Sequence, residues 1–370
     1  MTFKPPRVLH VISRLSYYGA ENVVDALVRE LHGQGYPVGV LAMYESPNAS
    51  LAAPFPYYSI ARRGRGDLGF FSRMLRAVRD FKPDIVHTHV HNGKYWGRLA
   101  ALAAGVRTIV HTEHDSAFRA HPLAVLGNHL LHPRTRRIVT FTPSHRAALL
   151  RGEPVSKKQL VTIPNGIADA RAVGDAPTIR ALLGERCGSP IVAHVGRLRV
   201  VKNQRLALEA FALFARDFPH ATLALIGEGE QRAMLETLRD ELALGDRVHF
   251  LGFRPDARAL LESADALLVT STNEAMPLAV LEALMGGVPV ATTPWPGAGD
   301  ILAGGALASI SSDYSPHSVA QTLASLFTDA NVPARTAAAT RFAREYYGIA
   351  RCAQLHRELY ESLCPSTGSG

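Results

Sequence analysis

Short runs of β-branched and aliphatic residues alternate along the chain with longer stretches in which apolar residues recur at helical spacing. This alternation is typical of βαβ units, because a crossover between parallel strands needs a connection long enough to form a helix. In the first half the pattern predicts strands at Val8–Ser13, Val38–Met43, Ile85–His89, Thr108–Thr112, Ile138–Thr142 and Leu160–Ile163, and helices near 20–34, 67–80, 93–104 and 143–151.

The same alternation begins again after Gly188 and ends in a last helical stretch near 340–362. Two successive sets of this kind, without a repeat of 20–50 residues, predict the fold class α/β, with two Rossmann-like doubly wound domains that face a cleft. The second set is predicted to hold strands at Ile191–Val195, Thr222–Ile226, Val248–Leu251, Ala266–Thr270, Val288–Ala291 and Leu307–Ile310, and helices near 203–217, 229–243, 255–263, 277–286 and 315–329.

The joint between the domains is expected near Pro164-Asn165-Gly166, a turn signature that is followed by an Ala- and Gly-rich stretch. The predicted limits are therefore 1–165 for the first domain and 166–340 for the second. Residues 341–370 are expected to form a helix that packs back on the first domain, followed by a disordered tail.

The composition excludes several classes of protein. Of the 370 residues, 47% are hydrophobic and 19% are charged, which is too apolar for a disordered chain. No apolar run approaches the ~18–20 residues of a membrane span, and the N-terminus lacks a signal-peptide core, so a cytoplasmic protein is expected. The three cysteines, Cys187, Cys352 and Cys364, have neither disulfide nor zinc-ligand spacing.

The net charge of +8 is unevenly distributed. Residues 1–165 carry 22 Lys and Arg against 10 Asp and Glu, whereas the remainder carries 18 against 22. A basic first half suggests contact with an anionic membrane surface or a phosphorylated acceptor. Nucleic acid is not expected as a partner, since no nucleic-acid-binding motif accompanies the short cluster Arg134–Arg137.

The most informative segment runs from Ser271 to Val290 and begins at the carboxyl end of a predicted strand, where ligands bind in open α/β sheets. Pro277 suits the first turn of a helix. This places Glu274 in the preceding loop and Glu282 inside the helix, about 12 Å further on at ~1.5 Å per residue. Two carboxylates at that separation suit the ends of one elongated ligand. Between them, the segment Ala275, Met276, Pro277 and Leu278 offers a phosphate the free backbone N–H groups of its residues other than the proline.

A second motif, Gly196 to Asn203, follows the strand Ile191–Val195. Lys202 lies at the start of a helix, where a cation is disfavoured unless an anion neutralises it and the helix dipole together. The planar guanidinium group of Arg197 and the compact charged ammonium group of Lys202 are both suited to bind a diphosphate. If these residues take the place of a metal ion, the leaving-group charge is stabilised without Mg²⁺. The alternative is that they are solvated loop charges, which is the reading we favour for Arg199.

These motifs resemble those of retaining glycosyltransferases of the GT-B fold, family 4. The resemblance rests on Gly196-Arg197-Leu198 with Lys202, on Pro164-Asn165-Gly166, on Gly227-Glu228-Gly229 after a strand, and on Glu274 with Glu282. It covers nearly the whole chain. It implies a donor site in the second domain, an acceptor site in the first, and transfer in the cleft with retention at the anomeric carbon.

Carried over to this sequence, the resemblance implies that Arg197 and Lys202 hold the diphosphate, that Glu274 faces the sugar hydroxyls and that Glu282 faces the ribose. The base would stack near 250–254, with Phe253 as the proposed contact. Two features differ from the family's pattern. Ala275 replaces a common glycine, and the stretch Trp295–Asp300 replaces a Gly-Gly pair before an acidic residue.

In the first domain the resemblance points to Gly19 and Ala20, where the backbone would approach the phosphates or the acceptor. Tyr18 stands where the family often has a second glycine, so either the loop is tighter there or the ring contacts the acceptor, to which Tyr18 is assigned. His114 matches the histidine that is thought to contact the donor sugar or the transition state; the alternative is a structural histidine.

The run His87-Thr88-His89-Val90-His91 places alternate side chains on one face of a strand, which is compatible with metal binding. The order of downstream residues that metal-dependent hydrolases use is missing, so no metal is predicted. An acceptor-lining role or a purely structural one is expected instead, and His89 and His91 are assigned to the acceptor. The basic stretch from Arg62 to Arg79 predicts either a packed helix with a solvated face or a peripheral contact with anionic lipid.

The sequence therefore predicts a metal-independent retaining glycosyltransferase without a resident cofactor. The expected reaction moves a hexose from a nucleoside-diphosphate donor, with UDP favoured over GDP or ADP, to a saccharide or lipid-linked saccharide in polysaccharide or glycolipid assembly. The predicted catalytic residues are Glu274, His114, Arg197 and Lys202. Alternatives are a nucleotide-sugar epimerase, a glycosyl phosphorylase and a non-catalytic sugar-nucleotide-binding subunit.

Overall fold

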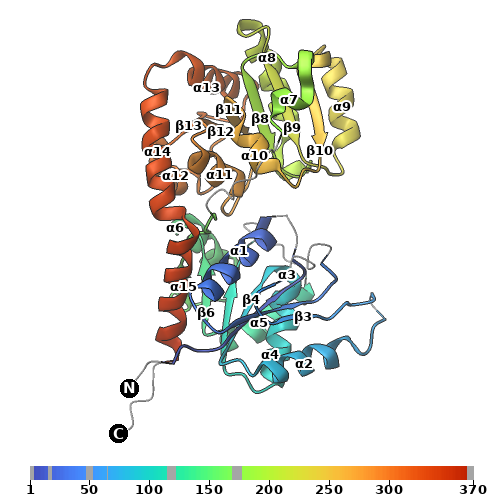
Figure 1. Cartoon of the computed structure of the whole chain (residues 1–370), viewed down its shortest axis with the longest axis vertical. Helices are drawn as coiled ribbons and strands as arrows, with labels where there is room; N and C mark the ends of the chain where they lie inside the picture. The colour runs from blue at the N-terminus through green and yellow to red at the C-terminus, as the bar shows by residue number, and fades with distance from the viewer. Residues whose placement is uncertain are drawn as a thin grey trace. The chain divides into compact units, whose positions relative to one another are not determined.

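The computed structural model describes residues 4–15, 19–46, 53–64, 66–114, 122–168 and 177–364, without the side chains of residues 91 and 122–124. The chain divides into two compact units, one formed by residues 1–168 with 348–370 and the other by 169–347. Each unit is built on one parallel sheet (Figure 1). The predicted α/β class with two Rossmann-like domains is confirmed.

The first unit contains a seven-stranded sheet in the order β3-β2-β1-β4-β5-β6-β7, with every neighbouring pair parallel. The strand order reverses beside β1, which is the switch point of a doubly wound sheet. The strands are β1 Val8–Ile12, β2 Val38–Ala42, β3 Tyr57–Ser59, β4 Ile85–His89, β5 Thr108–Thr112, β6 Arg137–Thr140 and β7 Leu160–Thr162. The helices are α1 Gly19–Gly33, α2 Phe70–Phe81, α3 Val90–Asn92, α4 Arg98–Ala103, α5 Pro122–Leu131, α6 Pro143–Gly152 and α15 Ile349–Leu363.

The second unit contains a six-stranded parallel sheet in the order β10-β9-β8-β11-β12-β13. Its strands are β8 Ile191–Val195, β9 Thr222–Ile226, β10 Val248–Gly252, β11 Ala266–Val269, β12 Val290–Thr292 and β13 Ser309–Ile310. Its helices are α7 Ile179–Leu183, α8 Gln204–Asp217, α9 Arg232–Glu241, α10 Ala257–Glu262, α11 Leu278–Gly286, α12 Ala298–Ile301, α13 Pro316–Thr328 and α14 Val332–Tyr347.

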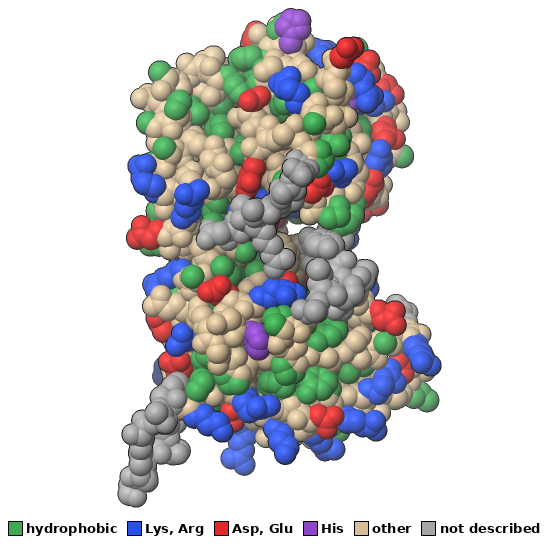
Figure 2. All heavy atoms as spheres, viewed as in Figure 1, with side chains coloured by type: hydrophobic (Ala, Val, Ile, Leu, Met, Phe, Trp, Pro, Cys, Tyr) green, Lys and Arg blue, Asp and Glu red, His purple; other side chains and the backbone are tan. Residues whose placement is uncertain are grey.

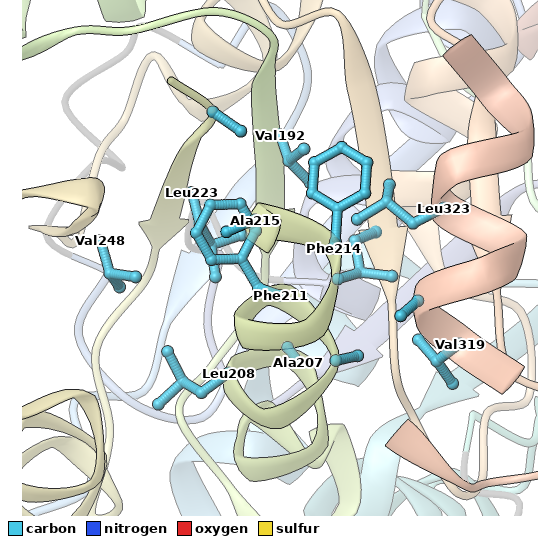
Figure 3. Packing of buried hydrophobic residues seen from close by; sticks show 14 of the residues in the cluster. Val192, Ala207, Leu208, Phe211, Phe214, Ala215, Leu223, Val248, Val319 and Leu323 are labelled. Carbon is cyan, nitrogen blue, oxygen red and sulfur yellow. The ribbon is translucent and has the colours of Figure 1, made fainter. Parts of the chain in front are cut away.

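Helix α8 shows how the sequence builds the core of the second unit. Its apolar residues recur every three or four positions, and it ends at Asp217, two residues before Pro219. Phe211 and Phe214 are completely or almost completely buried against the sheet and against α13 (Figure 3). Burying side chains of this size contributes about 1.5–3 kcal/mol each, so this packing fixes the strands whose ends carry the motifs.

The C-terminal helical stretch, predicted as one helix near 340–362, is two helices separated by Gly348. The first, α14, belongs to the second unit, and the predicted limit at residue 341 falls inside it. The second, α15, packs in the first unit, where Tyr360 is fully buried in the core. The amide of Ile349 donates to the carbonyl of Ile167, so both chain segments that leave the first unit are joined by a hydrogen bond.

Candidate functional site

The motif residues of the second unit lie in loops that follow four adjacent strands. These loops are 196–203 after β8, 227–230 after β9, 253–254 after β10 and 270–277 after β11. The carboxyl ends of parallel strands meet at one edge of a sheet, which is where open α/β sheets bind ligands. The predicted donor residues are therefore brought to one edge of this sheet.

Glycines allow the backbones of the first two of these loops, 196–203 and 227–230, to lie in direct contact. The amide of Leu198 donates to the carbonyl of Glu228 at 3.0 Å. A Cβ atom added at Gly229 would lie 2.3 Å from the carbonyl oxygen of Leu198, and one added at Gly227 would lie 2.0 Å from that of Gly196. Gly227 also has φ +144°, which L side chains rarely adopt. The two glycine motifs are thus parts of one packing arrangement, and Gly227 and Gly229 position the loop that carries Arg197.

Lys202 and Glu274 form an ion pair across two of the loops. The Nζ atom of Lys202 lies 2.5 Å from Oε1 of Glu274, and the Ser271 hydroxyl donates to the same oxygen at 2.6 Å. The two side chains are 24% and 13% exposed, so the pair is accessible but largely shielded from water. Partial shielding strengthens the attraction between opposite charges. Two residues that the sequence predicted for one donor site are therefore in direct contact.

Threonines fix the loop of Lys202 against the loop of Glu274. The Thr270 hydroxyl lies 3.0 Å from the carbonyl oxygen of Lys202 and 2.9 Å from that of Asn203. The amide of Thr272 donates to the carbonyl of Val201 at 2.9 Å. These bonds fix the backbone from which the Lys202 side chain extends.

Helix α11 begins one residue later than predicted. Pro277 is the N-cap, with φ −72° and ψ +120°, and Leu278 is the first helical residue. Met276 and Pro277 are buried, whereas Ala275 and Leu278 are partly exposed. The positive end of the helix dipole therefore lies in the segment between Glu274 and the helix, at the sheet edge that carries Lys202.

Glu282 lies within α11, on a helix that contacts α10. Burial raises the pKa of its carboxyl group, the charge of Arg258 on α10 opposes that shift, and Glu262 adds to it. The charge of this carboxylate is thus costly in the unliganded protein. A hydroxyl donor such as a ribose would offset part of that cost.

The remaining donor candidates lie at the same edge. Arg197 follows Gly196 and its side chain is exposed, while its carbonyl accepts a hydrogen bond from the Gln204 amide at 2.9 Å. Phe253 follows Gly252 at the end of β10 and is 39% exposed. An exposed aromatic ring at a loop is compatible with stacking on a base.

In the first unit, Gly19 is exposed with φ +36° and begins α1 directly after the loop that follows β1. Ala20 is the next residue of that helix and is partly exposed. Tyr18 lies outside the described residues. His91 lies in α3 but its side chain is not described, so its assignment to the acceptor stays a prediction.

His114 follows β5 and is partly exposed. Its loop is anchored by Glu113, which accepts a hydrogen bond from Lys94 at 2.7 Å and lies 3.6 Å from His111. Burial alone would raise the pKa of the Glu113 carboxyl, but His111 and Lys94 hold it well below its usual range. Glu113 is thus a buried carboxylate that ties His114 to the core.

The prediction that His89 lines an acceptor is wrong for this structure. His89 is 1% exposed, and both its ring nitrogens are engaged, Nε2 with Nδ1 of His10 at 3.0 Å and Nδ1 with Nε2 of His114 at 3.3 Å. His89 therefore contacts His114 from the interior of the unit through a hydrogen bond instead of meeting a ligand. Sequence reasoning also missed His10, whose only signal is a polar residue inside the apolar run of β1.

His10, His87 and His89 have ring nitrogens within 4.8 Å of one another, a grouping of the kind that metal ions use. Both nitrogens of His87 are already bonded, however. Nδ1 lies 2.6 Å from the Tyr360 hydroxyl and Nε2 lies 2.7 Å from the Thr112 hydroxyl. The contacts of this cluster are those of a hydrogen-bonded group of neutral imidazoles.

The basic stretch from Arg62 to Arg79 forms a loop and helix α2. The apolar face of α2 is buried, including Phe70 and Met74, and the Arg62 guanidinium lies 4.5 Å from the centre of the Phe70 ring. This agrees with a packed helix that leaves its basic face to solvent. Figure 2 shows Lys and Arg side chains along the lower rim of this unit. Among the described residues, no helix combines the length and apolar character needed to cross a bilayer.

Comparisons with known proteins agree with this geometry. Residues 17–171 match the family model described as Glycosyltransferase Family 4, and residues 175–342 match the model described as Glycosyl transferases group 1. Together the two matches cover most of the chain. The protein thus belongs to the group 1 glycosyltransferases of the GT-B fold.

Curated relatives match part of the chain. It is 28% identical over 235 residues to the UDP-Gal:alpha-D-GlcNAc-diphosphoundecaprenol alpha-1,3-galactosyltransferase of Escherichia coli, covering 60% of this chain and 61% of the relative. It is also 28% identical over 233 residues to the 2-deoxystreptamine N-acetyl-D-glucosaminyltransferase of Streptomyces fradiae, covering 58% and 55%. The chain thus matches less than two thirds of the length of these relatives.

Solved structures share the fold over nearly the whole chain. Anabaena HepE in complex with UDP-glucose superimposes with a TM-score of 0.83 at 19% identity, covering 96% of this chain and all of that one. WaaG, a glycosyltransferase involved in lipopolysaccharide biosynthesis, gives 0.73 at 16% identity, covering 98% and 100%.

Proposed function

We propose that this protein is a retaining glycosyltransferase that moves a hexose from a nucleoside diphosphate to a hydroxyl group of a saccharide or lipid-linked saccharide. The observation that carries the proposal is the Lys202–Glu274 pair, held over the carboxyl ends of β8 and β11 beside the first turn of α11. A cation, a helix N-terminus and a carboxylate at one place suit a sugar diphosphate, which is anionic at one end and rich in hydroxyl donors at the other.

The proposed donor is a UDP-sugar. HepE, with the same fold, is described in complexes with UDP and with UDP-glucose, and the Escherichia coli relative is named for its UDP-galactose substrate. In this proposal the diphosphate lies near Arg197 and Lys202, the sugar hydroxyls meet Glu274, the ribose meets Glu282 and the base stacks on Phe253.

The proposed reaction breaks the bond between the anomeric carbon and the β-phosphate oxygen and forms a bond from that carbon to the acceptor oxygen. The acceptor proton passes to the departing phosphate, so attack and departure occur on the same face and the configuration is retained. Negative charge develops on the diphosphate, and Lys202, Arg197 and the first turn of α11 stabilise it without a divalent metal. His114 of the first unit acts as a hydrogen-bond donor to the reacting groups.

The acceptor is proposed to be a saccharide in polysaccharide or glycolipid assembly, by analogy with relatives whose names include a diphosphoundecaprenol acceptor and lipopolysaccharide core synthesis. A peripheral contact with anionic membrane remains part of this proposal, because the exposed arginines Arg76 and Arg79 leave α2 with a basic outer face.

The test is a transfer assay in EDTA, with UDP-glucose, UDP-galactose and UDP-N-acetylglucosamine offered to a panel of saccharide and lipid-linked acceptors. The expected result is an α-linked product from an α-linked donor, identified from the anomeric proton coupling in NMR spectra. An inverted product would contradict retention, and activity that appears only after Mg²⁺ or Mn²⁺ is added would contradict metal independence. Conversion of the donor without any acceptor would identify an epimerase, and strict dependence on inorganic phosphate a phosphorylase.

A further inference from the structure

Three histidines of the first unit form a continuous line of hydrogen bonds from the core of that unit to His114. Nδ1 of His10 lies 3.0 Å from Nε2 of His89, and Nδ1 of His89 lies 3.3 Å from Nε2 of His114. His10 is fully buried in β1, His89 is 1% exposed at the end of β4, and His114 is partly exposed after β5. The line therefore ends on its one member that is not fully buried.

The three rings are neutral. Burial, with a smaller effect of His356, lowers the pKa of His10 to about 3. Burial lowers the pKa of His114 to about 4, and the pKa of His89 lies well below its usual range for the same reason. A neutral imidazole carries one N–H and one bare nitrogen. Two successive bonds between such rings run in one direction only, so the proton position of one ring determines the other two.

The direction follows from the buried end of the line. Nε2 of His10 has no hydrogen-bond partner among the described residues. If the bonds ran inward from His114, His10 would carry its proton on this nitrogen as a buried N–H without an acceptor, which proteins avoid more strictly than an unused acceptor. If the bonds run outward, His10 donates from Nδ1 and only a bare nitrogen is left unpaired.

We propose that His10 and His89 are positioning residues that place the proton of His114 on Nδ1, with Nε2 held as an acceptor, so that His114 meets its ligand as a donor from Nδ1. This inference rests on the proposed function for the role of His114, but the proton position itself is a property of the unliganded protein. It assigns a purpose to two buried histidines that touch no ligand.

The line of three histidines is distinct from its neighbours in the cluster. His87 lies 5.1 Å from His10 by ring centroids, but its nitrogens bond to the Tyr360 and Thr112 hydroxyls. Removing the Tyr360 hydroxyl therefore perturbs the same cluster without breaking the line, which provides a matched control.

The test is ¹⁵N NMR of the histidine rings in selectively labelled protein, which reports the nitrogen that carries each proton. Wild type is expected to show His114 protonated on Nδ1. His10→Leu removes the terminal donor and is expected to give a mixture of both forms at His114. His10→Asn retains an amide donor near the place of Nδ1 and is expected to keep the wild-type form, and so is Tyr360→Phe.

Transfer kinetics on the same variants separate positioning from packing. His10→Leu is expected to lower kcat at least about tenfold while changing KM for the donor less than about twofold, and His10→Asn to restore kcat to within about threefold of wild type. A wild-type His114 protonated on Nε2, or a His10→Leu spectrum with His114 unchanged, would overturn the inference. Absence of sugar transfer by wild type would count against the proposed function and leave the spectra as an independent test.

Discussion

Acidification between pH 7.5 and 5.5 is predicted to unfold the first unit before the second. Among the described residues of the first unit, six histidines are at most 4% exposed and burial lowers the pKa of each of them, by a large amount in five and by less in His132. The five are His10, His87, His89, His111 and His356. The pKa of His10 and of His111 is lowered to about 3 and that of His356 to about 4.

The sign follows from proton linkage. These side chains stay neutral in the folded state, whereas in the unfolded chain they bind protons below pH ~6.5. The stability that they contribute is therefore complete above pH ~6.5 and is lost as the pH falls toward the folded pKa. At pH 5.5 each group favours the unfolded state by about 1.4 kcal/mol, and five together by about 7 kcal/mol, which is comparable with the whole stability of a typical domain.

The second unit contains one comparable group, His194, which is 2% exposed with a pKa lowered by burial to about 4. Its expected loss at pH 5.5 is therefore about 1.4 kcal/mol. Hydrogen exchange followed by mass spectrometry, resolved by peptide, measures both units in the same sample. Peptides of β1, β4 and β5 are expected to lose protection between pH 6.5 and 5.5 while peptides of β8 and β9 keep it.

A variant provides the internal control for this pH dependence. His356→Gln removes one of the five titrating groups, so the pH dependence of the first unit's free energy of unfolding should decrease by up to about 1.4 kcal/mol per pH unit. Equal loss of protection in both units, or a free energy of unfolding that does not change between pH 7.5 and 5.5, would refute the reasoning.

Three further predictions concern the second unit. Glu282→Gln should raise the melting temperature at pH 7.5 and lose this advantage toward pH 4.5, because burial raises the folded pKa of that carboxyl. The resulting loss of stability begins above the unfolded pKa and is complete above the folded pKa. An equal gain at both pH values would contradict this. Glu274→Gln should lower kcat about 10²–10³-fold without changing the melting temperature. The control is Glu230→Gln, at a side chain that is 60% exposed, which should leave the rate unchanged. Equal rates in the two variants would remove Glu274 from the site. Gly229→Ala should weaken UDP binding at least about tenfold in calorimetry, because the added Cβ atom would lie 2.3 Å from a backbone carbonyl oxygen. The control is Gly33→Ala, whose Cβ atom would have nothing within 4 Å and which should bind UDP as wild type does. Unchanged affinity in Gly229→Ala would show that the loop tolerates the displacement.

The periodicity of the sequence predicted the two sheets because central parallel strands are mostly apolar runs, as at Val8–Ile12 and Ile191–Val195, each of which contains one histidine. It missed β3, a three-residue edge strand, and α5, whose first five residues are all apolar and so show no alternation between an apolar and a polar face. It also joined α14 and α15, because the helical spacing continues on both sides of Gly348 and one glycine is tolerated within such a pattern.

The candidate site was predictable as a set of loops but not as a set of contacts. Motif spacing places Lys202 and Glu274 at carboxyl ends of strands. The two residues are 72 positions apart in the sequence, however, and they meet only because β8 pairs with β11. The same holds for His10 and His89, 79 residues apart, which meet because β1 pairs with β4. The error over His89 arose because alternation along a strand shows which side chains share a face, but not how deeply that face is buried.

The most direct test of the account is calorimetric titration of UDP into the protein in EDTA. One site per chain is expected, with an affinity that Mg²⁺ leaves unchanged and that Lys202→Ala weakens at least about tenfold through the loss of one charge-assisted contact. Arg199→Ala, in the same loop with a side chain 51% exposed, is the control and should bind as wild type does. Absence of binding without a divalent metal, or equal affinity for wild type and Lys202→Ala, would contradict the proposal that a nucleoside diphosphate is held by Lys202 at this edge of the second sheet.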